Sequence, residues 1–166
     1  MPGTHYLSPT GSDANPGTLE QPWRSLQFAV DQLRPGERLL LRGGLYELTE
    51  MVTIRCQGSN LAPIVIAAAP GELPVIDASR VPLGNHVDPR PYPEEQGALL
   101  LQDAAHLRLH GLRVQNSHNA GIMVRDSQYI GLTNNTVETT YACGIALWDT
   151  YEHKGTCRYI RVLGNT

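Results

Sequence analysis

Two consecutive stretches of the 166-residue chain repeat one another: residues 105–126 read AHLRLHGLRVQNSHNAGIMVRD, and residues 127–150 read SQYIGLTNNTVETTYACGIALWDT. The equivalent positions, each 23 residues apart, are Leu109 and Leu132, Gly111 and Asn134, Val114 and Val137, Gly121 and Gly144, Ile122 and Ile145, and Asp126 and Asp149. One offset shared by apolar, turn and acidic positions indicates a structural repeat.

The repeat extends in both directions from this pair. Residues 98–103 (ALLLQD) match GIMVRD of the first stretch, 23 residues later. IVI at residues 64–66 matches LRL one repeat plus a 20-residue insertion later, and a looser copy runs through residues 39–54. At the other end, RYIRVLGNT (residues 158–166) repeats the second stretch with about seven extra residues before it.

Each copy holds three stretches of three to five apolar or alternating residues, separated by Gly, Asn, Asp or Ser. Stretches this short form strands rather than helices. Stacked units can pair equivalent strands in parallel and so bury one continuous apolar column. The LxxLxL spacing of leucine-rich repeats is absent. We therefore predict an all-β fold, a parallel β-helix of about four coils.

One segment departs from the repeat and predicts a helix. Residues 18–37 (TLEQPWRSLQFAVDQLRPGE) have a proline near the start and a Pro-Gly stop. The apolar residues at helical spacing are Trp23, Leu26, Ala29, Val30 and Leu33. We expect this amphipathic helix to cap the first coil, whose edge strands are otherwise unpaired. Residues 1–38 would form an N-terminal strand and the cap, and residues 39–166 the coils, with insertions at 77–97 and 148–157.

Composition limits the classes of function. The net charge is −3 and there is a single lysine, which argues against a basic groove for nucleic acid. No apolar run approaches the ~20 residues that cross a bilayer, and the first residues lack a signal-peptide pattern. Cys56, Cys143 and Cys157 form no CxxC pair, so no zinc site is indicated. Both a Cys143–Cys157 bridge and three free cysteines that are small buried or half-buried hydrophobes stay open.

The N-terminal sequence also carries a family resemblance. Residues 5–47, with SPTGSDANPGTLEQPW, the cap segment, PGE and RGGLY, resemble the N-terminal part of secreted right-handed parallel β-helix proteins. These are polysaccharide lyases of the pectate-lyase type, family 9 above all, and related bacterial β-helix repeat proteins. The resemblance implies a right-handed coil, a secreted or periplasmic protein, and calcium-dependent β-elimination on an acidic polysaccharide.

The resemblance also orients the coils. In such proteins a tight turn with a left-handed residue separates the second and third sheets. Gly111, Asn134 and Gly164 fit that turn because Gly and Asn tolerate positive φ best. The strands of the first sheet are then residues 99–101, 122–124 and 145–147. The family's substrate cleft lies over this sheet, and both insertions flank it.

Asp103, Asp126 and Asp149 follow these strands at offsets of 23. Carboxylates stacked about 4.8 Å apart need a counter-charge, and Ca²⁺, which takes six to eight oxygen ligands, would supply it. The resemblance supports this site, since family-9-like lyases hold calcium with clustered Asp, although their NSDDG-type cluster is missing here. Alternatively, each Asp ends a strand with a local turn bond, and Arg125 offsets the charge.

A lyase must remove the proton α to a carboxylate, which requires a base beside a metal or an arginine. Lys154 is the only lysine in the chain, and Lys154 or Arg125 is the candidate base. The alternative for Lys154 is a solvated loop residue.

Three further residues are candidates for binding a sugar. His118 and Tyr141 are equivalent positions at the entry to the first sheet, and Trp148 offers a ring for stacking. The outward positions between them, Leu100, Met123 and Ala146, are apolar. We expect the insertion at 77–97 to cover this strip.

Three functions are open on the sequence: a calcium-dependent lyase, a non-catalytic segment that binds carbohydrate or serves as scaffold, and an adhesin- or tailspike-like structural module. We favour the second for this chain, as the N-terminal segment of a longer lyase-like protein. The sequence stops directly after a turn that leads toward another strand. We therefore expect either end-to-end self-association through an open last coil or a frayed terminus.

Overall fold

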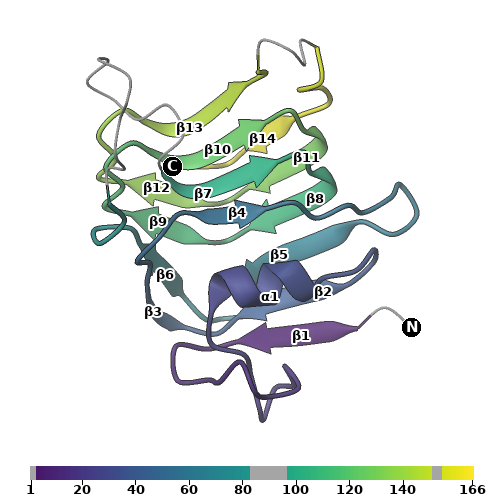
Figure 1. Cartoon of the computed structure of the whole chain (residues 1–166), viewed down its shortest axis with the longest axis vertical. Coiled ribbons are helices and arrows are strands. Elements are labelled where there is room, and N and C mark those ends of the chain that lie inside the picture. The colour runs from purple at the N-terminus through teal and green to yellow at the C-terminus, as the bar shows by residue number, and fades with distance from the viewer. Residues whose placement is uncertain (1–2, 83–96, 151–154) are drawn as a thin grey trace.

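A computed structural model describes residues 3–82, 97–150 and 155–166. In these residues the chain forms three sheets of parallel strands and one short helix (Figure 1). Sheet A has the order β1 (Thr4–Leu7), β2 (Arg38–Leu41), β5 (Ile64–Ala68), β8 (Ala105–His110), β11 (Gln128–Thr133) and β14 (Arg161–Leu163). Sheet B holds β3 (Gly44–Glu47), β6 (Pro74–Asp77), β9 (Arg113–Gln115) and β12 (Thr136–Glu138). Sheet C holds β4 (Val52–Ile54), β7 (Gly97–Gln102), β10 (Ala120–Arg125) and β13 (Cys143–Trp148).

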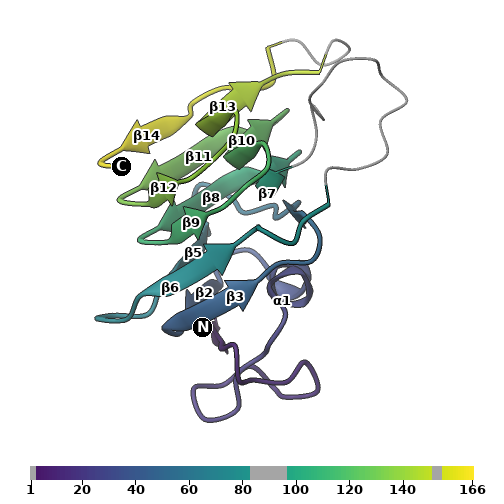
Figure 2. The ribbon, with the colours of Figure 1, turned by 90° about the vertical axis from the view of Figure 1, so that its left-hand side faces the viewer.

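The strands follow one another from sheet to sheet, so that each turn of the chain adds one strand to each sheet. Figure 2 shows these turns stacked one upon the next. Ile122 pairs with Leu99 on one side and with Ile145 on the other, which is the 23-residue offset of the repeat. The predicted parallel β-helix of about four coils is confirmed.

The inward side chains form one core enclosed by the three sheets. Leu99 and Ile122 of sheet C, Leu109 and Leu132 of sheet A, and Val114 of sheet B are at most 1% exposed. Full burial of a side chain of this size stabilises the fold by about 1.5–3 kcal/mol. Because equivalent residues repeat in every coil, the same apolar column continues through the stack.

A tight turn joins sheet A to sheet B in successive coils. Gly111, Asn134 and Gly164 have φ of 68°, 54° and 62°. The left-handed turn predicted for this column is therefore present. It is followed in two coils by an asparagine, Asn135 and Asn165, whose side chains turn inward to the backbone.

Asn135 is fully buried and connects three coils. Its Oδ1 accepts a hydrogen bond from the backbone N–H of Leu112 (3.0 Å), and its Nδ2 donates to the carbonyl of Leu109 (3.3 Å). Nδ2 also donates to Oδ1 of Asn165 (2.9 Å) in the next coil. Buried backbone groups need such partners, because an unsatisfied one costs about 1–3 kcal/mol.

The cap helix is present but shorter than predicted. Helix α1 spans Leu26–Gln32 and buries Leu26, Ala29 and Val30, whereas Trp23 lies before it and bridges to Leu7 of β1. The reason is Asp13, whose Oδ1 accepts the backbone N–H groups of Arg24 and Ser25 (both 2.9 Å) and holds this stretch extended.

Helix α1 covers the edge of sheet C at β4 (Figure 1). The Gln27 side chain takes the place of a neighbouring strand there: its Oε1 accepts the N–H of Thr53 (2.8 Å) and its Nε2 donates to the Thr53 carbonyl (3.0 Å). The helix thus satisfies an edge strand, which is the capping role expected of it. In the part of the chain that the structure describes, no helix is long and apolar enough to cross a membrane.

At the opposite end, β12, β13 and β14 are the last strands of their sheets. Leu147, Val162 and Leu163 at this end are 42–50% exposed. End-to-end self-association through these edges stays a prediction.

Replacing Asn135 with alanine removes the side-chain bonds between coils and leaves the buried N–H of Leu112 without its partner. We expect Asn135→Ala to lower the free energy of unfolding by about 2–3 kcal/mol, measured by urea denaturation. The neighbouring change Asn134→Gly keeps the left-handed turn and should change the free energy of unfolding by no more than about 0.5 kcal/mol. Equal losses in the two variants would contradict the role given to Asn135.

Asp77 at the end of β6 links coils through its carboxylate. It accepts hydrogen bonds from the side chains of Gln115 (2.8 Å) and Asn116 (2.6 Å) and from the N–H of Ser79 (2.9 Å). Burial raises the pKa of Asp77, but these bonds outweigh it and lower the pKa to about 2. Because this pKa is lower in the folded chain than in the unfolded chain, the ionised carboxylate stabilises the fold above about pH 4.

The stabilisation from Asp77 should be lost as the pH falls from about 4 toward 2. We expect the free energy of unfolding of the wild type to fall over this range by about 1–2 kcal/mol more than that of Asp77→Asn, in urea titrations at a series of pH values. Glu50→Gln, at an exposed carboxylate, is the control and should follow the wild type. Parallel curves for wild type and Asp77→Asn would show that Asp77 does not cause the acid sensitivity.

Candidate functional site

The predicted catalytic and metal residues that the structure describes gather where sheet C ends. Gln102, Arg125 and Trp148 pair across β7, β10 and β13. The aspartates follow directly in the turn toward sheet A. Asp103 and Asp126 have φ of 50° and 49°, a left-handed conformation that Asp adopts more readily than most residues. The strands end here because the chain turns at these positions.

The Asp126 carboxylate is buried and bonded to the following coil. Its Oδ1 accepts the N–H of Thr150 (2.8 Å) and lies 3.3 Å from the hydroxyl of Thr156. Its Oδ2 is 3.3 Å from Nε2 of Gln102, which also donates to Oδ2 of Asp103 (2.8 Å). Gln102 therefore joins two of the three aspartates, a role that the sequence analysis did not assign to it.

The third aspartate holds the loop after β13. Oδ2 of Asp149 accepts the N–H of Gly155 (2.6 Å), and its Oδ1 accepts the N–H of Cys157 (2.6 Å) and the hydroxyl of Thr156 (3.1 Å). Desolvation raises the pKa of Asp149, but these donors outweigh it and keep the pKa below its ordinary value. The carboxylate is thus ionised at neutral pH and committed to local bonds.

These contacts bear on the calcium hypothesis. Hydrogen-bond donors point at the carboxylates of all three aspartates, whereas a cation needs those oxygens for itself. Within residues 3–82, 97–150 and 155–166, no group of three or more His, Cys, Asp or Glu side chains is arranged to hold a metal ion. Calcium binding would require the donors to turn away, and it stays a prediction.

Of the two candidate bases, the structure describes Arg125. The Arg125 guanidinium donates through Nε to Oε1 of Gln102 and is half-buried. Arg125 therefore belongs to the same hydrogen-bonded group as Asp103 and Asp126. Lys154 lies outside the described residues.

The three candidate sugar-binding residues lie at opposite ends of sheet C. His118 and Tyr141 precede β10 and β13, and both are exposed; Nε2 of His118 is 3.1 Å from the carbonyl oxygen of Ser79. Trp148 ends β13 at the other side and packs against the cluster of Leu100 and Met123. The structure thus places Trp148, but not His118 or Tyr141, beside the aspartates.

Two of the three apolar outward positions of sheet C are closed to solvent, and the third, Ala146, is half-buried. Leu100 is 2% and Met123 0% exposed, and Met51, Ala146 and Trp148 pack around them. Residues 83–96 of the insertion expected to cover this strip lie outside the described residues. A small hollow of about 140 Å³ beside Asp103 and Asp126 is too small for a sugar ring, since ligand pockets hold about 300–1,000 Å³.

All three cysteines are free, so the bridge left open for Cys143 and Cys157 does not form in this structure. The alternative of three buried or half-buried cysteines holds for Cys56 and Cys157 and is wrong for Cys143, which is exposed. Burial raises the pKa of Cys56 to about 11, and the charge of Asp31 adds to this effect. Burial also raises the pKa of Cys157, with a further contribution from Asp149. Both thiols are therefore protonated at neutral pH and are weak nucleophiles.

One exposed feature was missed in the sequence analysis. His106, Tyr129 and Tyr159 form a stack of rings on the outward face of sheet A, with centroids 4.5 and 4.6 Å apart and nearly parallel planes. All three residues have φ between 50° and 57°. They are separated by 23 and 30 residues, the same offsets as the apolar repeat, so comparing the outward positions of the repeat would have found them.

The comparisons with known proteins agree with this architecture. The family described as "Pel9A-like, right handed beta helix region" matches residues 5–162. Pectate lyase PEL9 of Emericella nidulans is 34% identical over 143 residues, which are 86% of this chain and 35% of that protein. Pectate lyase L of Paenibacillus polymyxa is 33% identical over 138 residues, 82% of this chain and 27% of that protein. The chain spans about a third of the length of these curated relatives.

Two solved structures share the fold. The native GH136 lacto-N-biosidase from Eubacterium ramulus has a TM-score of 0.78 at 22% identity, covering 98% of this chain and 34% of that one. The crystal structure of pectate lyase Pel9A has a TM-score of 0.71 at 20% identity, covering 89% and 37%. Proteins with these two different names share one architecture, so function must be argued from the residues.

Asp149→Asn tests whether this carboxylate holds the loop. The asparagine amide has one oxygen and an NH2 group that cannot accept, so the N–H groups of Gly155 and Cys157 should exchange several-fold faster with deuterium, while those of β10 stay protected. In the wild type, the same protection should persist at neutral pH and fall when acid protonates Asp149, at a pH below the ordinary range for Asp. Asp31→Asn on α1 is the control; an unchanged loop in Asp149→Asn would refute the assignment.

Proposed function

Since this chain belongs to the Pel9A-like right-handed β-helix family, we propose that it is the N-terminal segment of a polysaccharide lyase-like protein that acts on an acidic, uronate-containing polysaccharide. The observation that carries the proposal is the match over residues 5–162, together with identities of 34% and 33% to two pectate lyases. The whole protein would act outside the cell, where such polysaccharides occur.

Within that protein, this segment would supply the scaffold and saccharide contacts rather than the reacting groups. β-Elimination needs a base that can take a proton and a positive group that stabilises the developing charge. At the end of sheet C, Arg125 donates to Gln102 and the aspartates accept bonds from neighbouring loops. These groups already serve the fold.

The buried strip of sheet C supports the same division of roles. The outward positions Leu100 and Met123 of this sheet are apolar and closed to solvent, so they offer a saccharide chain no row of polar groups. Sugar hydroxyls left without partners on such a surface lose binding free energy. This arrangement favours a scaffold in these coils.

The decisive experiment incubates the chain with polygalacturonate and calcium and follows the ultraviolet absorbance of unsaturated products. We expect no turnover, an unchanged melting temperature with calcium, and millimolar binding of oligogalacturonate by calorimetry. Product formation would show that the segment is itself catalytic. A marked calcium-induced rise in melting temperature that Asp126→Asn abolishes would establish the calcium site.

The choice of saccharide tests the substrate class separately. Neutral oligosaccharides of the same length should bind more weakly than oligogalacturonate, because only the latter offers carboxylates. Equal binding of the two would overturn the acidic-polysaccharide assignment without touching the family.

A further inference from the structure

A row of arginines crosses the outward face of sheet A. The register of β2, β5, β8, β11 and β14 aligns Arg38, Val65, Arg108, Gly131 and Arg161. Their neighbours along the strands point into the core, so these five positions point outward. With adjacent strands about 4.8 Å apart, an arginine recurs on every second strand, at intervals of about 10 Å.

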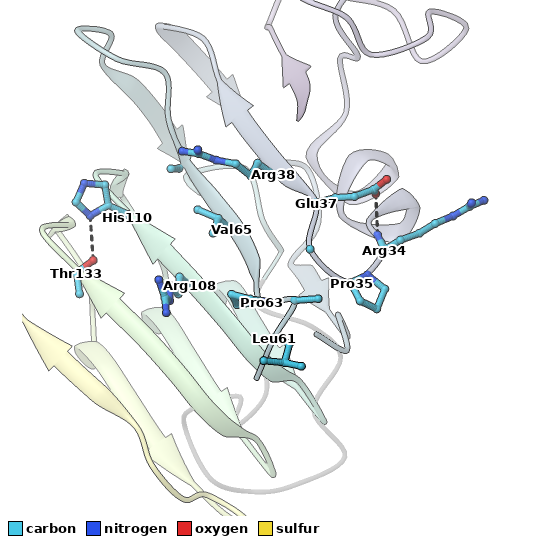
Figure 3. Close-up of a pocket in the computed structure, with 13 residues that line it drawn as sticks. Arg34, Pro35, Glu37, Arg38, Leu61, Pro63, Val65, Arg108, His110 and Thr133 are labelled. Atoms are coloured by element: carbon cyan, nitrogen blue, oxygen red, sulfur yellow. Dashed lines mark hydrogen bonds between the residues drawn. The ribbon is translucent and has the colours of Figure 1, made fainter. Parts of the chain in front are cut away.

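The first part of this row lies in a groove of about 900 Å³ (Figure 3). One wall is the loop between α1 and β2, with Arg34, Pro35 and Glu37, and the other end is bounded by Leu61 and Pro63. The floor is formed by side chains of β2, β5, β8 and β11. This volume falls within the range of saccharide-sized ligand sites, unlike the hollow beside the aspartates.

No acidic residue in the described ranges forms an ion pair with the arginines of the groove, whereas two other arginines on the coils are paired. Arg42 forms an ion pair with Glu72, and Arg113 forms one with Glu138. In the part of the chain that the structure describes, neither Arg38 nor Arg108 has an acidic partner. Both are exposed, so each guanidinium is available to a ligand.

Acidic groups do not neutralise the groove. Of the described residues that line it, Glu37 alone is acidic, and its Oε2 accepts the N–H of Arg34 (2.8 Å) and lies 3.5 Å from Nε2 of His5. Arg34, Arg38 and Arg108 line the groove together with this single carboxylate. The groove is therefore positively charged although the chain as a whole carries a net charge of −3.

The neighbouring residues are suited to a sugar. The stack of His106, Tyr129 and Tyr159 lies on the same face as the arginine row. Each ring stands two residues before a position of that row, namely Arg108, Gly131 and Arg161. The exposed Tyr129 and Tyr159 (43% and 66%) offer phenolic hydroxyls beside the arginine row. On the other side, His110 is hydrogen-bonded to the Thr133 hydroxyl (2.9 Å, Figure 3). The guanidinium groups, which can bind carboxylates, are thus flanked by ring and hydroxyl groups that can contact the sugar itself.

We propose that the outward face of sheet A is a binding surface for an acidic saccharide chain, whose uronate carboxylates pair with Arg38 and Arg108. A guanidinium matches a carboxylate with two parallel hydrogen bonds, which gives both strength and orientation. The inference rests on the proposed acidic-polysaccharide function and assigns it a surface away from sheet C. Binding there would weaken as salt rises, because the charges are exposed.

The test is a titration of the ¹⁵N-labelled chain with oligogalacturonate, followed by amide chemical shifts. Shifts should concentrate on β2, β5, β8 and β11, and Arg38→Gln/Arg108→Gln should weaken binding by about tenfold or more. Arg24→Gln/Arg80→Gln removes the same charge from exposed sites outside the groove and should bind within about twofold of the wild type. Thermal unfolding of both double variants checks that the fold is kept.

The outcomes separate this inference from the proposed function. If oligogalacturonate shifts only sheet C resonances and the groove variant binds normally, the surface on sheet A is wrong while the substrate class stands. If oligogalacturonate produces no shifts, both are wrong. If dextran sulfate fills the groove and oligogalacturonate does not, the site is a general anion site and the uronate assignment fails.

Discussion

The structure depends on the pairing of each coil with the next in an unbroken parallel register. A single coil has three short strands and cannot bury its own apolar side chains, so both the backbone hydrogen bonds and the core exist only between coils. The pairing of Ile122 with Leu99 and Ile145 sets the 23-residue period. Any position of a coil is therefore repeated one strand spacing away. Asn135, buried between coils, shows how strictly the turns must obey this spacing.

The same constraint explains why polar residues form columns. Stacking brings Asp103 and Asp126 together at one edge of sheet C, where the cost of adjacent charges is relieved by Gln102 and by the donors of the next loop. On sheet A it aligns Arg38 with Arg108 across Val65, where no such relief exists in the described residues. One column is satisfied from within the protein, and the other presents unpaired charge to solvent. This difference directs the search for a ligand toward sheet A.

Most of the fold could be predicted because the apolar residues recur at the spacing of the repeat. The period, the left-handed turn at Asn134 and the cap over the first coil all follow from residue type and spacing. The start of the cap helix could not be predicted from the sequence. Asp13 binds the backbone of Arg24 and Ser25 and so keeps Trp23 outside the helix, and this interaction is non-local. Likewise, the spacing of the aspartates was visible in the sequence. Their partners were not, because Gln102 and Thr156 are recruited by the three-dimensional stack.

The arginine row was hidden for a related reason. Insertions between the coils interrupt the offset between Arg38 and Arg108, and only the observed register places them on one row. We propose that this segment of a Pel9A-like right-handed β-helix protein is a scaffold whose polar saccharide contacts lie on sheet A. A crystal structure of the chain with bound oligogalacturonate tests it most directly. It should show saccharide carboxylates within hydrogen-bond distance of the Arg38 and Arg108 guanidinium groups; a saccharide bound over sheet C alone would contradict the account.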